Sequence, residues 1–216
     1  MKEAMNDLRG EAQVCYVFGA GDACDVRVPP GKADLVVAAD GGLRQLEDLG
    51  IRPDVILGDF DSLGFVPEGE QVRVFPTAKD ETDLMIACRE GLARGYRVFR
   101  LYGGLGGARV SHTVANLQLL RWLADQGAAG TLYGPTCEVT LLRDRTVRFP
   151  AGQTGFLSLF AAGEQAVVTV RGAAYELEKG VLTGRFPLGV SNAFCGRETE
   201  VTVHEGDLLV ILEPEA

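Results

Sequence analysis

The sequence lacks the features that would point to nucleic acid or to a membrane. Basic residues are in deficit, with 21 Lys and Arg against 30 Asp and Glu and a net charge of −9, whereas a protein that grips a phosphate backbone needs clustered cations. No apolar run approaches the roughly 20 residues of a membrane span. The N-terminal segment carries Glu3 and Asp7 where a signal peptide would be basic. We therefore expect a soluble cytoplasmic protein with no nucleic-acid partner and no membrane partner.

Cysteine pairing is the second missing feature. Thiolate metal sites and redox motifs depend on close pairs of cysteines, but here the cysteines are odd in number and no two stand as C-x-x-C. We interpret them as small buried thiols. They are Cys15, Cys24, Cys88, Cys137 and Cys195.

Glycine is the residue in excess, at 28 of 216 positions, where the usual share is about 7%. Glycines and aspartates follow short apolar runs at residues 14–18, 35–39, 55–57 and 98–102. Continuous aliphatic runs suit strands that are buried on both faces of a parallel sheet.

Helical periodicity separates these runs. Apolar residues recur along one face over 43–49, where Gly50 is the stop, and again over 84–92 and 114–123. The third helix is predicted to begin near Ser111 and to end near Gly127. Alternating strands and helices through about residue 130 predict an open, mostly parallel α/β sheet with right-handed crossovers.

The pattern changes after Tyr133-Gly134-Pro135. From Cys137 onward no stretch has helical period, and the apolar runs are short, at 139–142, 155–160, 166–170 and 208–212. Punctuation by Gly, Pro and Asn is typical of antiparallel strands in a small sandwich or barrel. We expect an α/β domain over 1–134 followed by an antiparallel β-sandwich domain over 135–216.

Aspartates gather where the predicted strands end, which is where ligands bind in open α/β sheets. Carboxylates at one sheet edge repel one another unless a cation is bound, and oxygen ligands of this kind suit Mg²⁺. The sequence therefore predicts a magnesium site near this edge. The candidate residues are Asp40, Asp59, Asp61, Asp80 and Asp83.

The bland alternative is that these aspartates serve turns and helix caps, because Asp is common at both. For Asp80 alone we prefer the cap, since Asp83 stands three residues later as in a capping box. For the set we favour a metal site. Asp59 and Asp61 are expected to present their carboxylates on the same side of an extended segment, with Phe60 between them.

A glycine-rich segment at 103–107 follows the fourth apolar run and opens the third helix. Glycines let backbone N–H groups approach a phosphate, and a helix N-terminus adds partial positive charge. Arg109 would add a permanently charged fork, and His112 a capping or positioning group. Alone the segment is weak support, because glycines also serve turns; beside an acidic metal site it predicts polyphosphate binding.

These motifs together resemble the thiamine pyrophosphokinase (thiamine diphosphokinase) family, in the family's order and over nearly the whole chain. The Gly-Asp-Phe-Asp-Ser string with Asp-x-Thr-Asp downstream is the most specific part. The matching pieces are 39–42, 53–54, 58–62, 79–83, 103–112, Asn116, Gly172, Tyr175, Leu177 and 189–192.

The resemblance implies an N-terminal catalytic domain that binds nucleotide and magnesium, a C-terminal β-sandwich that binds thiamine, and a homodimer with a shared active site. It implies transfer of the diphosphoryl group of ATP to the hydroxyl of thiamine, giving thiamine diphosphate and AMP. The implied magnesium and catalytic residues are Asp59, Asp61, Asp80 and Asp83. The implied nucleotide-binding residues are Asp40, Gly41, Gly103, Gly104, Arg109, His112 and Asn116, and the implied thiamine-binding residues are Ser191, Asn192 and Thr82.

One position departs from the family pattern, because Ser111 stands where the family commonly has Asp. Two rivals therefore stay open. The first is a pyrophosphokinase that acts on another alcohol, such as a hydroxymethylpterin. The second is a non-catalytic nucleotide-binding module.

Overall fold

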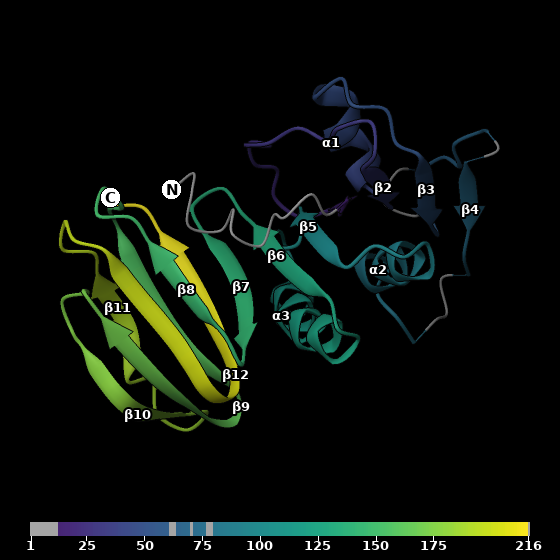
Figure 1. Cartoon of the computed structure of the whole chain (residues 1–216). Helices are drawn as coiled ribbons and strands as arrows, with labels where there is room; N and C mark the ends of the chain where they lie inside the picture. Colours follow the sequence, from purple (N-terminus) through teal and green to yellow (C-terminus); the bar gives the residue numbers. More distant parts are fainter. Residues whose placement is uncertain (1–12, 61–63, 70, 77–79, 216) are drawn as a thin grey trace. The chain divides into compact units, whose positions relative to one another are not determined.

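The computed structural model describes residues 13–60, 64–69, 71–76 and 80–215 (Figure 1). The chain divides into two compact units, with the division between Pro135 and Thr136. Strands pair in parallel in the N-terminal unit and antiparallel in the C-terminal unit. Parallel and antiparallel pairing are thus segregated along the chain.

The N-terminal unit is built on a parallel sheet in the order β6-β5-β1-β2-β3-β4. The apolar runs predicted as strands are confirmed, whereas β6 was missed because its Gly-Thr sequence interrupts the aliphatic pattern. The bounds are β1 (Val14–Phe18), β2 (Leu35–Ala39), β3 (Val55–Gly58), β4 (Val72–Val74), β5 (Val98–Tyr102) and β6 (Ala129–Tyr133).

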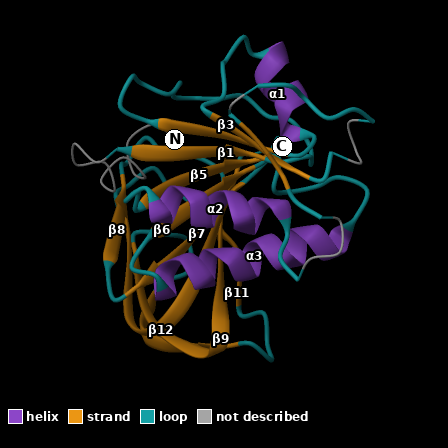
Figure 2. Cartoon of the chain, turned by 90° about the vertical axis from the view of Figure 1, so that its right-hand side faces the viewer, coloured by secondary structure: helices purple, strands orange, loops and turns teal. Residues whose placement is uncertain are grey.

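Helices cover both faces of this sheet. They are α1 (Gly42–Asp48), α2 (Asp83–Ala93) and α3 (Val110–Asp125), and α2 and α3 lie side by side (Figure 2). Tyr16 packs into the core with Leu43 and Leu46 of α1, while its neighbour Cys15 faces Gly91 of α2. Successive side chains of β1 therefore point to opposite layers, as in a strand buried on both faces.

The predicted helical faces need two corrections. Leu49 is 44% exposed, because α1 ends at Asp48 before that residue reaches the core. Val114 is 51% exposed; the buried side of α3 carries Asn116 and Leu119 instead. The start of this helix at Val110 agrees with the predicted start near Ser111.

An aromatic stack fills the α1 side of the sheet. Tyr102 stacks on Phe18 and on Tyr133, each with ring centroids 4.9 Å apart. Burial raises the pKa of Tyr102 well above its ordinary value, with neighbouring Tyr133 adding to the effect. The stack is therefore an uncharged platform at the carboxyl ends of the central strands.

The C-terminal unit consists of antiparallel strands, and no helix occurs among its described residues, 136–215, as predicted. The order is β10-β9-β12-β7, with β11 also paired to β9 and β8 to β12. The bounds are β7 (Glu138–Arg143), β8 (Thr146–Phe149), β9 (Phe156–Arg171), β10 (Leu177–Thr183), β11 (Gly189–Ala193) and β12 (Thr199–Glu213).

Two long strands, β9 and β12, form the centre of this unit (Figure 1). The runs at 155–160 and 166–170, read as separate strands in the sequence, belong to the single 16-residue β9. Besides pairing with each other, the two long strands each pair with two further strands, one near each end. Strand β12 pairs with β8 near its start and with β7 near its end, and β9 pairs with β11 near its start and with β10 near its end. The enclosed core includes Phe149, Leu157 and Val210.

The cysteine prediction holds in part. Cys15 and Cys88 are buried, and their burial raises both thiol pKa values, with other charges contributing less. Cys195 is exposed, so the interpretation as a buried thiol is wrong there. Among the described helices, none combines the length and apolar character of a membrane span.

Candidate active site

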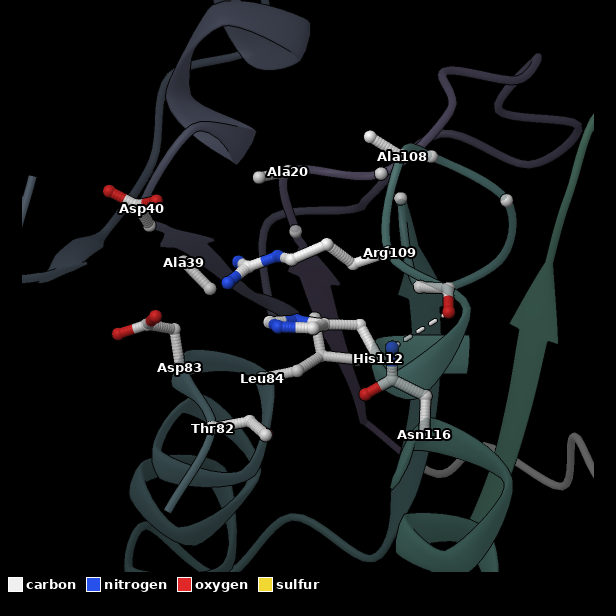
Figure 3. Close-up of a pocket in the computed structure, with 16 residues that line it drawn as sticks. Ala20, Ala39, Asp40, Thr82, Asp83, Leu84, Ala108, Arg109, His112 and Asn116 are labelled. Atoms are coloured by element: carbon white, nitrogen blue, oxygen red, sulfur yellow. Dashed lines mark hydrogen bonds between the residues drawn. The ribbon is translucent and has the colours of Figure 1, made fainter. Parts of the chain in front are cut away.

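A pocket lies at the carboxyl ends of β1, β2 and β5 in the N-terminal unit (Figure 3). Its walls come from the turn at 19–21, from Asp40 after β2, from the start of α2 at 82–84 and from residues 103–109. His112 and Asn116 reach it from α3. Segments far apart in the sequence thus converge where parallel sheets bind ligands.

Two glycine turns form one wall of this pocket and are hydrogen-bonded to each other. Gly19 N–H donates to the Tyr102 carbonyl and Gly21 N–H to the Gly103 carbonyl, both at 2.8 Å. Gly103 has a φ of +62°, and a Cβ there would overlap the Gly19 carbonyl oxygen. Glycine is therefore required at 103 by both backbone conformation and close approach.

The second turn leads directly into α3, whose N-cap residue is Arg109. The backbone N–H groups of 106–109 donate to none of the described residues, and the first turn of the helix adds partial positive charge. This corner of the pocket is suited to bind an anion such as a phosphate.

Arg109 makes no side-chain capping bond to α3. In Figure 3 its guanidinium group points toward the side of the pocket where Asp40 and Asp83 lie, and His112 projects into the pocket beside it. Permanent positive charge on one side thus faces carboxylates on the other. A cation with a polyphosphate would complement both sides.

Asn116 supports the second glycine turn. It is buried, and its Nδ2 donates to the Gly104 carbonyl at 2.7 Å (Figure 3). This bond engages the Gly104 carbonyl oxygen, which would otherwise repel an incoming anion. The structure thus brings Asn116 to the pocket, with its amide N–H engaged by the chain itself.

Asp40 is held in an unusual backbone conformation at the end of β2. Its φ is +50°, and its N–H donates to the Leu57 carbonyl at 2.7 Å. A Cβ at Gly58 would lie 3.0 Å from the Asp40 Cα, so the ends of β2 and β3 approach closely. The Oδ1 atom of Asp40 is buried and has no hydrogen-bond partner among the described residues. Such an oxygen is a candidate ligand for a cation.

Asp59 follows β3, but the segment after it is not extended as expected. Phe60 has a φ of +61° and is only 2% exposed, buried in the core with Phe18 and Tyr102. A bulky residue rarely adopts this backbone conformation, and burial of its ring holds it there. The expectation of an extended segment is therefore wrong at Phe60, and the relation between the carboxylates of Asp59 and Asp61 stays a prediction. Asp61 itself lies outside the described residues, as do Ser62 and Lys79.

The start of α2 also differs from the expectation. Thr82 is the N-cap residue, and its Oγ1 accepts a hydrogen bond from Met85 N–H at 3.2 Å. Asp80 is exposed and precedes the helix, so neither the cap at Asp80 nor its helical pairing with Asp83 is found. Thr82 is the better cap because its hydroxyl is two residues closer to the first helical N–H groups.

Asp83 is the first residue of α2 and lines the pocket together with Asp40. Within the described part of the chain, no three His, Cys, Asp or Glu side chains gather closely enough to hold a metal. The described acids therefore form a partial set on one side of the pocket.

Gly41, expected to bind nucleotide, is the N-cap residue of α1, with a φ of −59°. The neighbouring Gly42 is the position with no room for a side chain, because a Cβ there would overlap the Phe18 carbonyl oxygen. Of this glycine pair, close packing thus constrains the second member.

Two of the three residues expected to bind thiamine, Ser191 and Asn192, lie in β11 of the C-terminal unit, whereas the third, Thr82, lines the pocket of the N-terminal unit. Ser191 is exposed, has a φ of +56° and donates its N–H to Ser158 Oγ at 3.0 Å. Asn192 is buried, and its amide bonds both backbone polar groups of Tyr175, at 2.9 Å and 2.7 Å. The side chain of Tyr175 is 73% exposed. Asn192 thus holds an aromatic residue at the surface.

Sequence reasoning missed Gln45 and the contribution of the turn at 19–21. Gln45 of α1 donates from Nε2 to the carbonyls of Gly19 and Gly21. The Gly-Ala-Gly string directly after β1 was an available signal, because it occupies the same position relative to its strand as the glycines after β5. No sequence signal marks Gln45, because its role depends on a long-range contact.

The fold and pocket define an α/β protein with a candidate ligand-binding site at the carboxyl edge of its parallel sheet. Family models narrow this class. Residues 31–130 match "Thiamin pyrophosphokinase, catalytic domain", and residues 145–209 match "Thiamin pyrophosphokinase, vitamin B1 binding domain". These two matches together span most of the chain, which belongs to the thiamine pyrophosphokinase family.

A sequence relative and several solved structures are similar to this chain. Thiamine pyrophosphokinase from Bacillus subtilis is 35% identical over 95 residues, which are 40% of this chain and 42% of that protein. The sequence alignment therefore spans less than half of that relative.

The structural likeness is more extensive. The crystal structure of the Bacillus subtilis thiamine pyrophosphokinase matches with a TM-score of 0.81 and 22% identity, covering 94% of this chain and 100% of that chain. That from Geobacillus thermodenitrificans matches with a TM-score of 0.79 and 25% identity, covering 94% and 99%. The fold of most of the chain is thus similar to that of these solved structures.

Proposed function

We propose that this protein is an ATP-dependent thiamine diphosphokinase, which transfers the diphosphoryl group of ATP to the hydroxyl of thiamine and releases AMP. The observation that supports this proposal most directly is the pocket, where two glycine turns, Arg109 and the carboxylates of Asp40 and Asp83 converge. Family membership supports both substrates.

The phosphates of ATP would bind along the glycine wall. Gly103 and Gly104 let the backbone approach, and the N–H groups at the start of α3 supply donors. Arg109 would contact phosphate oxygens with its guanidinium group. His112, at the start of α3, would position that guanidinium group. Asp40 and Gly41, after β2, and Asn116, through Gly104, complete the proposed nucleotide site.

Magnesium is the expected cofactor, and the described residues fit it. The buried, unpartnered Oδ1 of Asp40 and the carboxylate of Asp83 face the same pocket, and oxygen ligands suit Mg²⁺. We assign the metal to Asp59, Asp61, Asp80 and Asp83, and the unpartnered Oδ1 of Asp40 would be a further oxygen ligand beside them. When bound, the ion would neutralise phosphate charge. The exposed Asp80 would act from the rim.

The chain's own residues would act mainly by positioning and charge. The thiamine hydroxyl oxygen forms a bond to the β-phosphorus of ATP while the bond from that phosphorus to the oxygen that bridges the α- and β-phosphates breaks. The oxygen leaves with AMP, and the hydroxyl proton is lost to solvent or to a pocket carboxylate. Arg109 would stabilise charge on the phosphates through this exchange.

Thiamine would bind through the C-terminal unit, which we propose packs as a β-sandwich. The cationic thiazolium and the flat aminopyrimidine of thiamine need an aromatic wall and a few polar groups. The exposed ring of Tyr175, anchored by Asn192, offers the wall, and Ser191 offers a hydroxyl. Thr82, whose hydroxyl caps α2, would contribute by fixing Asp83. A cytoplasmic homodimer that shares the active site between subunits completes the proposal.

The test is turnover by the purified chain with Mg-ATP and thiamine, measured as AMP and thiamine diphosphate in equal amounts. Hydroxymethylpterin serves as the competing alcohol. Preference for the pterin would replace the substrate and keep the ATP site. ATP binding without AMP release from either alcohol would favour the non-catalytic module.

A further inference from the structure

Gln45, in the middle of α1, contacts the backbone of the pocket wall. Its Nε2 donates to the Gly19 carbonyl at 3.0 Å and to the Gly21 carbonyl at 2.9 Å. A primary amide nitrogen carries two hydrogens, so both are used on this one turn. The same nitrogen lies 2.7 Å from the place where a Gly103 side chain would begin. Gln45 thus occupies the junction of the two glycine turns.

These bonds fix the direction of the peptide between Gly19 and Ala20. In a trans peptide the N–H points away from the carbonyl of the same unit. Because the Gly19 carbonyl is turned toward Gln45, the Ala20 N–H is directed away from it. Ala20 lines the pocket, and its N–H donates to no described residue. The turn therefore offers a donor on the side away from α1.

We propose that Gln45 is a positioning residue for polyphosphate binding. It holds two carbonyl oxygens of the first glycine turn away from the pocket, which leaves the Ala20 N–H for a phosphate oxygen. Without these bonds the peptide between Gly19 and Ala20 can rotate, because Gly19 on one side of it has no side chain to restrict the backbone, and a carbonyl oxygen turned into the pocket would repel phosphate. The proposal rests on the proposed function for the identity of the polyphosphate, which is that of ATP.

A purely structural role for Gln45 would have a different signature. The turn is also attached to the sheet by Gly19 N–H to Tyr102 and by Gly21 N–H to Gly103, and neither bond involves Gln45. Loss of the Gln45 amide therefore leaves the turn anchored and changes chiefly its orientation. Phosphate affinity should respond more than thermal stability.

The experiment compares three substitutions that suit a helix. Gln45→Met removes both donors at similar volume, Gln45→Glu places a carboxylate against the two carbonyls, and Gln45→Lys restores a donor. Glu47→Gln, at an exposed position of the same helix, is the matched control. Calorimetric Kd values for ATP and for adenosine are measured with Mg²⁺ and without thiamine, together with Tm.

We expect Gln45→Met to weaken ATP binding about tenfold, the effect of one or two hydrogen bonds, and Gln45→Glu to weaken it further. Gln45→Lys should return the Kd to within about threefold of wild type, and adenosine binding should stay constant. ATP affinity of Gln45→Met within twofold of wild type would overturn the proposal. Equal weakening for adenosine, or no recovery in Gln45→Lys, would also overturn it.

If Gln45→Glu fails to fold, the pair of Gln45→Met and Gln45→Lys decides the outcome. Because thiamine is left out, this result is independent of turnover. A wild-type chain that binds ATP but does not convert thiamine would contradict the proposed function and leave the role of Gln45 to be judged by the same Kd values.

Discussion

The two units differ in how the polar side chains at their candidate ligand-binding residues are engaged. In the C-terminal unit Asn192 bonds the backbone of Tyr175, and Arg143 pairs with Asp207 through two bonds of 2.5 Å and 2.9 Å, although Gln153 Oε1 is buried there without a described partner. In the N-terminal unit Asp40 Oδ1 is buried without a described partner, and Asp40 lines the pocket. Satisfied groups stabilise a fold, whereas an unsatisfied oxygen of a pocket residue is a candidate ligand atom. The comparison separates candidate residues that maintain the structure from candidate residues with capacity left for a substrate.

The largest expected effect is on the free energy of unfolding and concerns the core of the C-terminal unit. Phe149 is fully buried and meets Phe194 edge to face at 5.3 Å. Phe149→Ala should lower the free energy of unfolding by about 3–5 kcal/mol because it leaves a cavity, as measured by urea denaturation. Val181→Ala, at an exposed position of β10, is the control and should change it by less than about 0.5 kcal/mol. A loss below about 1 kcal/mol for Phe149→Ala would contradict this description of the core.

Substitution of a proposed metal ligand should have the reverse signature. Asp59→Asn should reduce kcat at least about 100-fold, because a metal ligand supplies several kcal/mol of transition-state charge stabilisation. The Tm should stay within a few degrees of wild type. Asp48→Asn, at the end of α1, is the control, and excess EDTA should abolish wild-type turnover. Activity of Asp59→Asn within threefold of wild type would remove Asp59 from the metal site.

A smaller effect is expected where the C-terminal unit meets its substrate. Ser191→Ala should raise the thiamine KM several-fold and leave the ATP KM unchanged, because only one hydroxyl contact is lost. Steady-state kinetics with each substrate varied in turn measure the difference.

The same variant tests the shared site. At a thiamine concentration below KM, a mixture of Ser191→Ala and Asp59→Asn should turn over faster than the sum of the two variants assayed alone if each active site draws on both subunits. Sedimentation that finds a fully active monomer would refute sharing, and equal rises in both KM values would refute the assignment of Ser191.

The smallest effect is expected at Ser111, in the first turn of α3. Ser111→Asp places a carboxylate near a helix N-terminus, which should add about 0.3–1 kcal/mol of stability. Thiamine turnover should be kept or raised, since the family commonly has Asp here. Ser111→Asn, similar in size and uncharged, isolates the effect of charge. AMP release with thiamine and with hydroxymethylpterin is the measurement, and wild-type preference for the pterin would contradict thiamine as the substrate.

The same comparison explains what the sequence could reveal. Strands buried on both faces are continuous aliphatic runs, so β1, β2, β3 and β5 were predictable, and the glycines after β5 indicated a close approach to a ligand. Backbone conformations that are set by tertiary packing were not predictable from the sequence. The left-handed conformation of Phe60, for example, depends on the core residues that surround its ring. The choice of Thr82 over Asp80 as a cap likewise depends on where α2 begins.

In the C-terminal unit the limit was different. Short apolar runs indicate strands but do not say which belong to one continuous strand, and β9 crosses the polar residues Glu164 and Gln165 without ending. Partial exposure of that stretch allows polar residues within the strand. The family resemblance, rather than periodicity, identified Ser191 and Asn192.

The aromatic stack beneath the glycine turns has a consequence for the evolution of this chain. Tyr102 lies between Phe18 and Tyr133 in the core, and its carbonyl oxygen receives the N–H of Gly19 in the pocket wall. One residue is therefore constrained twice, by its ring and by its backbone. Substitutions at Phe18 or Tyr133 that preserve stability can still tilt that carbonyl and so shift the pocket wall. Core residues that do not contact the ligand are therefore expected to be constrained by ligand binding as well as by folding. In a mutational scan these positions should tolerate fewer residues for activity than for folding.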